Sequence, residues 1–377
     1  MASDKQDKIL NVPTLRFPEF TDKWKECELQ DVASISKGAG ISKDQLSDTG
    51  EPCILYGELY TKYKSEVITD VLSKTNIDTA NLVRSKANDV IIPSSGETAI
   101  DISTARCVPF DNILLGGDLN ILRLREQDGR FFSYQLNGVR KLDIAQIAQG
   151  VSVVHLYGES LKRLIVRYPS ISEQEKISSL LAAIDERITT QNRIIEKLQS
   201  LMKGLAEHLT AFAPNTRIAD CLECHSSTLQ VNQLKEEGVY KVYGANGVCG
   251  YNDRPAITSD AILIVKDGSG VGNVSFVSGE YSIIGTSNYL TAKFGYSLKY
   301  LYYCLMIFNF DTYITGMAIP HIYFKDYGKA LIYCPTLDKQ VQIATLLSKI
   351  EYKIEAEKAI TDYYQQQKQF LLQSMFI

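Results

Sequence analysis

Residues 174–188 read QEKISSLLAAIDERI, and residues 340–354 read QVQIATLLSKIEYKI, at a constant offset of 166 residues. The apolar residues of both stretches recur at alternating steps of four and three, which is the spacing of one face of a long helix. This apolar seam continues to Leu209 in the first copy and to Met375 in the second. Each copy therefore predicts a helix of about 35 residues, which is about 50 Å long at 1.5 Å per residue.

The two predicted helices are expected to pair with each other in an antiparallel coiled coil. They are equal in length, and each seam has a polar interruption at the equivalent position, Gln191 and Glu357. A single amphipathic helix would more simply pack on its own domain, but two equal helices favour mutual pairing. The second seam weakens beyond Ile354, where Ile360 and Phe370 could rotate into it. The residues predicted to pair the helices are Ile177, Leu181, Ile184, Ile188, Ile343, Leu347, Ile350 and Ile354.

The repeat extends upstream of the helices. Residues 149–157 read QGVSVVHLY and residues 315–323 read TGMAIPHIY, at the same offset. Earlier segments still correspond, but with drifting offsets, as residues 89–92 do with residues 260–263. A repeat of this length indicates a duplicated unit. The order is therefore a variable domain, a constant helix, a second variable domain and a second constant helix.

The variable domains are predicted to be mixed α/β. Short runs rich in β-branched residues lie between turns of Gly, Ser, Asn and Asp, and these runs predict strands at 89–93, 113–115, 121–124, 261–265 and 281–285. An aromatic-rich helix is expected in each domain, at 131–142 and 298–308. The predicted fold is two similar mixed α/β (α+β) domains joined by two long antiparallel coiled-coil helices, as a pseudo-twofold internal repeat. Its predicted segments are a leader at 1–23, domains at 24–170 and 213–336, and helices at 171–212 and 337–377.

Composition is that of an ordinary globular protein, with 45% hydrophobic and 22% charged residues. No apolar stretch is long enough to span a membrane, and residues 1–10 are too polar for a secretory signal, so a cytoplasmic location is expected. The eight cysteines are scattered and are expected to be small buried apolar residues. The net charge is −4, and residues 215–336 hold nine Lys and Arg against ten Asp and Glu. Any nucleic-acid surface must therefore be a local patch, helped by partner subunits.

Two motifs resemble cofactor sites but are better explained otherwise. Residues 221–225, CLECH, match the c-type haem attachment pattern and half of a zinc site. No second cysteine pair stands at ligand spacing, and the first domain has no counterpart. Residues 266–273, KDGSGVGN, lack the spacing of a nucleotide-binding loop, and a strand is expected after them. They predict either a plain hairpin turn or a turn that offers Lys266 and backbone amides to a phosphate or a base edge.

His155 and His321 occupy equivalent positions and could suggest acid–base chemistry. The favoured interpretation is a histidine hydrogen-bonded within each domain. No methyltransferase, helicase or hydrolase motif is found in the sequence, so no catalytic, cofactor-binding or metal-ligating residue is predicted.

A family resemblance rests on segments at both ends of the first repeat. Residues 11–20, NVPTLRFPEF, are followed by Trp24 and by LQDV at 29–32, and residues 168–169, YP, lead into SEQEKI at 172–177. These segments and the tandem arrangement resemble the specificity subunits of type I restriction-modification systems, over nearly the whole chain. The second copy departs in two places, with KQVQ at 339–342 and with Glu351 in place of Asp185. These departures bear on how well the second helix pairs.

The resemblance implies two target recognition domains, each of which reads one half of a bipartite site in double-stranded DNA. It implies that the helices set the spacer and dock two modification subunits, which are methyltransferases that bind S-adenosylmethionine. Restriction subunits with translocase and nuclease activity would join the full complex, so this chain itself is expected to need no cofactor. Two other functions stay open: the recognition subunit of a nuclease-free DNA methyltransferase complex, and a coiled-coil scaffold that binds no DNA.

Base reading needs polar side chains on loops that reach a groove, while contacts to phosphates fix position. The candidate residues in the first domain are Lys37, Lys43, Tyr56, Ser94, Ser95 and Asn120. Those in the second domain are Tyr243, Asn246, Lys266, Ser269, Asn273, Ser287 and Asn288. An ordinary surface turn is the alternative for each of these loops.

Overall fold

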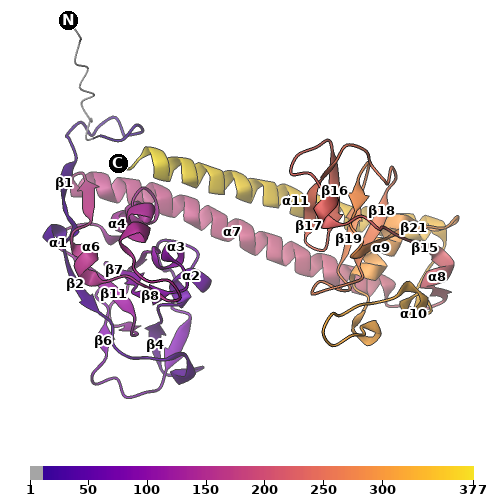
Figure 1. The fold of residues 1–377 in the computed structure, drawn as a ribbon, viewed down its shortest axis with the longest axis horizontal. Helices are drawn as coiled ribbons and strands as arrows, with labels where there is room; N and C mark the ends of the chain where they lie inside the picture. The colour runs from indigo at the N-terminus through magenta and orange to yellow at the C-terminus, as the bar shows by residue number, and fades with distance from the viewer. Residues whose placement is uncertain (1–11) are drawn as a thin grey trace, which may run out of the picture. The chain divides into compact units, whose positions relative to one another are not determined.

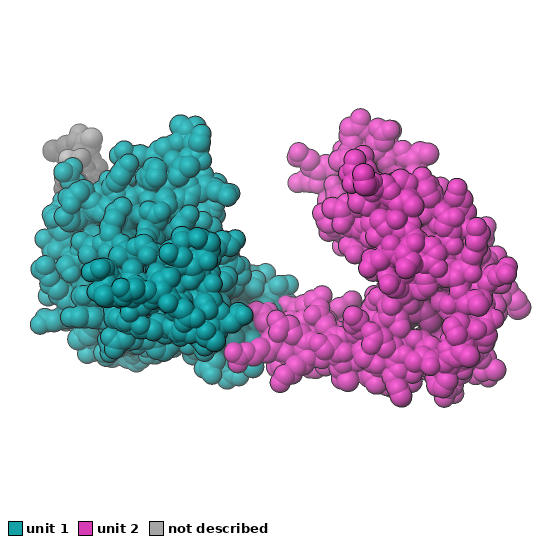
Figure 2. Space-filling model, turned by 90° about the horizontal axis from the view of Figure 1, so that it is seen from below, with its two compact units in different colours: residues 1–191, 360–377 teal, residues 192–359 magenta. Residues whose placement is uncertain are grey.

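The computed structural model describes residues 12–377, so the first eleven residues of the predicted leader lie outside the described residues. The chain divides into two compact units, unit 1 (residues 1–191 and 360–377) and unit 2 (residues 192–359), coloured separately in Figure 2. Helix α7 (Ile171–Thr210) begins in unit 1 and ends in unit 2, whereas α11 (Leu337–Ser374) begins in unit 2 and ends in unit 1. Their directions are therefore opposite (Figure 1). Because the units divide both long helices, the five segment boundaries drawn from sequence stay a prediction.

Two sheets form the body of unit 1. The first is four-stranded and antiparallel, in the order β2 (Ala33–Lys37), β11 (Leu119–Leu124), β7 (Asp89–Pro93) and β9 (Arg106–Val108). The second has the order β3 (Leu46–Ser47), β5 (Ser73–Thr75), β4 (Glu51–Ile54), β10 (Leu114–Leu115) and β6 (Val83–Arg84). Within this second sheet, β10 runs parallel to β4. Every residue of β7 is buried, as expected of a strand that is covered on both faces.

Unit 2 repeats this architecture in shortened form. Its four-stranded sheet has the order β15 (Leu222–Ser226), β21 (Ser287–Ala292), β18 (Ala261–Val265) and β19 (Val274–Val277). Its second sheet has the order β17 (Gly247–Asn252), β16 (Tyr240–Gly244) and β20 (Ser282–Ile283), and β20 again runs parallel to its neighbour. The matching orders confirm the predicted fold class of two similar mixed α/β domains.

Small elements complete both units, some of them in matching places. Two-stranded pairs join β1 (Lys25–Glu28) to β13 (Ile165–Tyr168), β8 (Ser95–Gly96) to β12 (Val154–His155), and β14 (Thr216–Arg217) to β22 (Leu331–Ile332). The short helices are α1 (Leu29–Val32), α2 (Glu58–Thr61), α3 (Ala99–Ile102), α6 (Gly158–Lys162), α8 (Ile218–Cys221) and α10 (Phe324–Tyr327). Three 3-10 segments, η1 (Lys43–Gln45), η2 (Val231–Gln233) and η3 (Asp311–Tyr313), lie in loops.

The aromatic-rich helices are α4 (Gly129–Asn137) and α9 (Leu298–Met306). The prediction of one helix over 131–142 is wrong, because α4 ends at Asn137 and α5 (Lys141–Ile147) follows separately. Gly138 is the C-cap of α4, and its N–H donates to the Tyr134 carbonyl at 2.9 Å. The break thus falls at a glycine inside an otherwise helical apolar pattern, which agrees with the low helix propensity of glycine.

The long helices pack on each other inside the core of each unit. In unit 1, Ile177, Leu181 and Ile184 of α7 share one apolar cluster with Leu371 and Met375 of α11. This cluster also contains buried side chains of the four-stranded sheet and of α4 in the first domain, so these elements and the long helices share one core. The long helices therefore form part of this domain's hydrophobic core and also connect it to the other domain.

In unit 2 the opposite ends of the helices meet. Met202 and Leu205 of α7 pack against the cluster that holds Ile343 and Leu347 of α11. Towards the middle of the seams, Ile188 of α7 and Ile350 of α11 are half-buried, and Ile354 of α11 is buried. Each helix end thus belongs to the core of the unit it lies in.

The expectation that Ile360 and Phe370 rotate into the second seam is wrong, since both side chains are exposed. Thr361 is buried, and Tyr364 and Lys368 are half-buried, so the strict spacing of four and three continues. Lys368 fits the seam because its Nζ lies 2.6 Å from Oδ1 of Asp185 on α7. Because Asp185 neutralises the charge of Lys368, this lysine can stay on the seam, and α11 does not rotate to bury Ile360 or Phe370 instead.

Matching glutamines fix each long helix to its domain. Gln174 accepts a hydrogen bond from the Asp128 N–H (3.1 Å) and donates to the Pro169 carbonyl (2.9 Å). Gln340 repeats this with the Ser297 N–H (2.9 Å) and the Pro335 carbonyl (2.8 Å). Asp128 and Ser297 are the N-caps of α4 and α9, so each glutamine fixes the register of a domain helix against a long helix.

A matching tyrosine–carboxylate contact lies further along each long helix. Tyr134 on α4 donates to Asp185 (2.7 Å), and Tyr303 on α9 donates to Glu351 (2.8 Å). Burial, followed by the negative charge of Asp185, raises the pKa of Tyr134, so the phenol stays protonated and remains a donor.

Among residues 12–377, no helix is both long and apolar enough to cross a lipid bilayer.

Candidate nucleic-acid interface

Several of the candidate loops of each unit emerge where the strands of the four-stranded sheet end, and we call this place the sheet edge. In unit 1, Lys37 ends β2 and lies opposite Asn120, near the start of β11, while β7 ends at Pro93. Antiparallel neighbours place the end of one strand beside the start of the next, so these positions meet at the same edge. In unit 2 the equivalent edge holds Ser226 opposite Asn288, with Lys266 directly after β18.

A hairpin is attached to this edge in both units. We name residues 149–155 the first hairpin and residues 315–321 the second hairpin. Gln149 and His155 exchange two main-chain hydrogen bonds, of 2.9 and 2.7 Å, and Thr315 and His321 exchange two of 2.9 and 2.8 Å. These exchanges close both hairpins at their bases.

The residue after each hairpin ties it to the strand edge. The N–H of Leu156 donates to the Ser94 carbonyl, and the N–H of Ile322 donates to the Lys266 carbonyl, both at 2.9 Å. The hairpins therefore stand beside the loops that follow β7 and β18, at equivalent places in the two domains.

Three candidate lysines are available to bind phosphate. Lys37 and Lys43 are exposed and Lys266 is half-exposed, and none of the three forms an ion pair within the part of the chain that the structure describes. In contrast, the arginines of the first domain are largely neutralised: Arg123 and Arg130 pair with Asp89 and Asp128 at 2.8 and 2.9 Å. The local patch that an acidic chain needs can thus come from these lysines.

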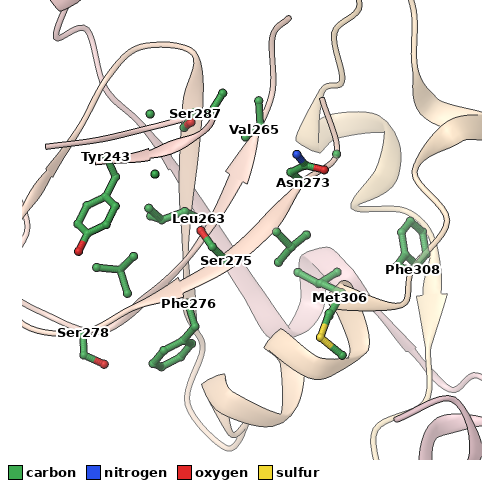
Figure 3. Close-up of a pocket in the computed structure, with 17 residues that line it drawn as sticks. Tyr243, Leu263, Val265, Asn273, Ser275, Phe276, Ser278, Ser287, Met306 and Phe308 are labelled. Atoms are coloured by element: carbon green, nitrogen blue, oxygen red, sulfur yellow. The ribbon is translucent and has the colours of Figure 1, made fainter. Parts of the chain in front are cut away.

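Each domain also has an open concavity beside its second sheet. In unit 1 it measures about 720 Å³, and Lys43, Tyr56 and Gly57 line it. In unit 2 it measures about 630 Å³, and Tyr243 and Gly244 line it in the equivalent place. Figure 3 shows Tyr243 at one end of this concavity and Asn273 towards the other, so it joins two loops predicted to contact DNA.

The glycine-rich turn of unit 2 is a hairpin connection between β18 and β19. The Val265 N–H donates to the Asn273 carbonyl (3.0 Å), and the Gly272 N–H donates back to the Val265 carbonyl (2.9 Å). Gly268 and Gly272 have φ values of +96° and +85°, which favour glycine. A strand follows the turn where a dinucleotide fold requires a helix. Ser269 and Asn273 remain exposed, as does Asn246 in the tight turn between β16 and β17.

Five of the predicted contact residues are buried, so their side chains are not presented to solvent: Ser94, Ser95, Asn120, Ser287 and Asn288. Asn120 donates from Nδ2 to the Leu156 carbonyl at 2.9 Å and thereby holds the first hairpin to the sheet. These residues were predicted to contact DNA because they are polar and lie near loops, but their side chains point into the domain and stabilise the sheet edge. They are not retained among the residues that we propose to touch DNA.

The CLECH segment is not arranged as a cofactor site. Cys221 ends α8 and its thiol donates to the Ile218 carbonyl at 3.3 Å, while burial raises the pKa of Cys224, on β15, to about 11. A thiol of this kind carries little thiolate at neutral pH. The His225 ring stacks on Tyr289 with ring centroids 4.7 Å apart, and Nε2 lies 3.0 Å from the Thr291 hydroxyl. Among residues 12–377, no group of three or more His, Cys, Asp or Glu side chains could hold a metal ion.

The repeated histidines lie on the surface beside exposed tyrosines. Nδ1 of His321 lies 3.2 Å from the Ile319 carbonyl, which agrees with a hydrogen bond inside the domain. The His155 ring is exposed and stacks on Tyr157, with ring centroids 6.1 Å apart, so that interpretation does not describe it. Tyr157 and Tyr323 were missed as candidates, although both stand in the repeated motif. Both tyrosines are exposed next to the hairpins, and a single sequence does not show which residues of a repeated motif are exposed.

Comparison with known proteins agrees with this architecture. The model of the type I restriction modification DNA specificity domain matches residues 21–200 and 215–363. Because these two matches cover most of the chain, the chain belongs to this family. The specificity subunit of the Escherichia coli type I restriction enzyme EcoprrI is 23% identical over 128 residues, which are 34% of this chain and 32% of that relative. The match thus spans about a third of that relative's length.

Two solved structures share the fold over nearly the whole chain. The S subunit of a type I restriction-modification system from M. genitalium has a TM-score of 0.67 at 17% identity and covers 97% of this chain and 99% of its own. A chain from a study of complex assembly and conformational transition of the type I R-M system has a TM-score of 0.53 at 15% identity, covering 93% and 96%. At these identities the likeness shows the fold.

Proposed function

We propose that this chain is the sequence-specific DNA-recognition subunit of a type I restriction-modification complex, and that each domain reads one half of a bipartite site. The observation that carries the proposal is the duplicated sheet edge, in a chain of the DNA specificity family. Lys37 stands at this edge in unit 1, and Lys266 stands there in unit 2. Lysines supply phosphate contacts that position a domain, and neighbouring polar loops supply base contacts.

The long helices are proposed to set the spacer between half-sites and to dock two modification subunits. Those subunits would supply the methyltransferase chemistry, and restriction subunits would join the larger complex. Supporting this, α11 has exposed large apolar side chains away from its buried seam, namely Val341, Leu346, Tyr352, Tyr363 and Phe370. Exposed apolar side chains gathered on one element are typical of surfaces that bind other proteins.

The proposal is tested with the chain assembled with its modification subunits and a randomised duplex DNA library. We expect selection and sequencing to return a bipartite motif, and retention to fall linearly with the logarithm of salt concentration. Replacing residues 215–335 with the equivalent domain of a relative should change one half of the motif and leave the other half and the spacer unchanged. A library that returns no motif would favour the scaffold function. A domain swap that changed both halves of the motif would contradict the proposal that each domain reads one half-site.

A further inference from the structure

We propose that both hairpins enter a groove of the DNA, and that Val151 and Met317 at their tips contact the base edges or deoxyriboses there. This inference rests on the proposed function and names a new contact within it. The first hairpin would act at one half-site and the second at the other.

The tips are fully open to solvent. Val151 is 96% exposed and Met317 is 104% exposed, and Val153 and Ile319 beside them are more than half exposed. Four apolar side chains in equivalent loops are thus left in water, although the residues that follow the hairpins, Leu156 and Ile322, are buried in the cores. An exposed apolar cluster that recurs at equivalent positions suggests a surface covered by a partner.

Each hairpin also turns tightly at a glycine. Gly150 has φ +125°, and a Cβ built there would lie 2.1 Å from the Val153 carbonyl oxygen. Gly316 has φ +90°, and its Cβ would lie 2.4 Å from the Ile319 carbonyl oxygen. Both hairpins therefore hold a tight shape that only glycine permits, and little conformational entropy is lost when such a loop binds.

Charge favours DNA as the partner. Residues 149–157 and 315–323 contain no Asp or Glu, in a chain that has 44 of them. The second hairpin is also held against the glycine-rich turn, where the Gly268 N–H donates to the Pro320 carbonyl at 2.9 Å. This contact brings it beside Lys266, which has no carboxylate partner among the described residues. A tip without carboxylates adds no negative charge of its own, and the lysine near it can contact a phosphate.

Size also favours a groove over a protein surface. A stable protein interface buries about 800 Å² on each partner, which is far more than two side chains at a loop tip can offer. The grooves of B-DNA are about 12 Å and about 6 Å wide and admit narrow elements. Apolar side chains there contact thymine methyl groups or insert between base steps.

The test uses Val151→Ser and Met317→Ser in the full chain, assembled with its modification subunits. The probes are the duplex selected by the wild-type complex and two duplexes in which one half-site is scrambled. We expect either variant to bind the selected duplex at least tenfold more weakly. Each variant should also lose discrimination only at its own half-site.

The matched controls are Ile165→Ser and Leu331→Ser. These two residues are equivalent in the repeat, are exposed, and lie on β13 and β22, which pair with β1 and β14 and not with the strands of the four-stranded sheets. The control variants should bind within twofold of wild type, and sedimentation should show intact assembly for all four variants. These results together would support the proposal.

Wild-type affinity in both hairpin variants would overturn the proposal, and so would loss of the modification subunits from them, since the hairpins would then be protein-docking elements. If the wild-type complex selects no DNA sequence, the proposed function itself fails. If the wild type selects DNA and the hairpin variants match it, only the hairpin contact is wrong.

Discussion

Asp185 shows how a few buried polar side chains orient a domain on its long helix. It accepts from the Tyr134 hydroxyl (2.7 Å) and the Ser65 hydroxyl (3.0 Å), and it pairs with Lys368. Three parts of unit 1, the first domain, α7 and α11, thus meet on one carboxylate. Buried polar groups are costly unless their hydrogen bonds are made, so this arrangement strongly disfavours other packings of the same apolar surfaces.

Removing the Tyr134 hydroxyl tests this at the residue scale. Tyr134→Phe deletes a hydrogen bond to a charged, nearly buried acceptor, and we expect the free energy of unfolding to fall by about 1.5–3 kcal/mol. Tyr303→Phe is the matched comparison, because its acceptor Glu351 also pairs with a lysine but is more exposed than Asp185. Its cost should be smaller, about 1 kcal/mol. Urea unfolding measures both, and equal costs would show that burial of the acceptor is not decisive.

Among the elements, α7 and the hairpins use glycine in opposite ways. Gly204 lies within α7, and a Cβ built there meets no atom within 4 Å. The hairpin glycines have positive φ and no room for a Cβ. The same residue type is therefore dispensable in the helix and required in the hairpin.

Alanine at these positions should accordingly change stability in opposite directions. Gly204→Ala should raise the free energy of unfolding by up to about 1 kcal/mol, because alanine restricts the unfolded chain and favours helix. Gly316→Ala should lower it by about 1–3 kcal/mol, because the second hairpin is forced out of its conformation. Differential scanning calorimetry reports both changes. A stabilising Gly316→Ala would mean that the hairpin is not constrained as the structure has it.

The whole molecule consists of two compact units through which both long helices pass. Each domain core includes turns from both helices, so neither helix is a simple linker. Because the apolar seam repeats every seven residues, length can be added in whole heptads without changing which face is buried.

Lengthening both helices by one heptad tests their proposed role as a ruler. A second copy of residues 185–191 after Gln191, with a second copy of residues 353–359 after Ala359, adds about 10 Å at 1.5 Å per residue. We expect the selected motif to keep both half-sites and to gain about three base pairs of spacer, at 3.4 Å each. Methylome or library sequencing reads this directly. Insertion into α7 alone is the control and should abolish selection, whereas an unchanged spacer in the double insertion would rule out the ruler.

The amino-acid sequence by itself determined the duplicated architecture and the two helices, because heptad spacing and a fixed offset are properties of neighbouring residues. Only the tertiary structure decided which polar loop residues are exposed. Asn120 is buried because the Leu156 carbonyl, 36 positions away, accepts its hydrogen bond, and no local pattern encodes that meeting. In the same way, Lys368 stays on the seam in place of Phe370 because Asp185 of the other helix neutralises its charge. Contacts between residues distant in sequence thus decided which polar side chains remain exposed.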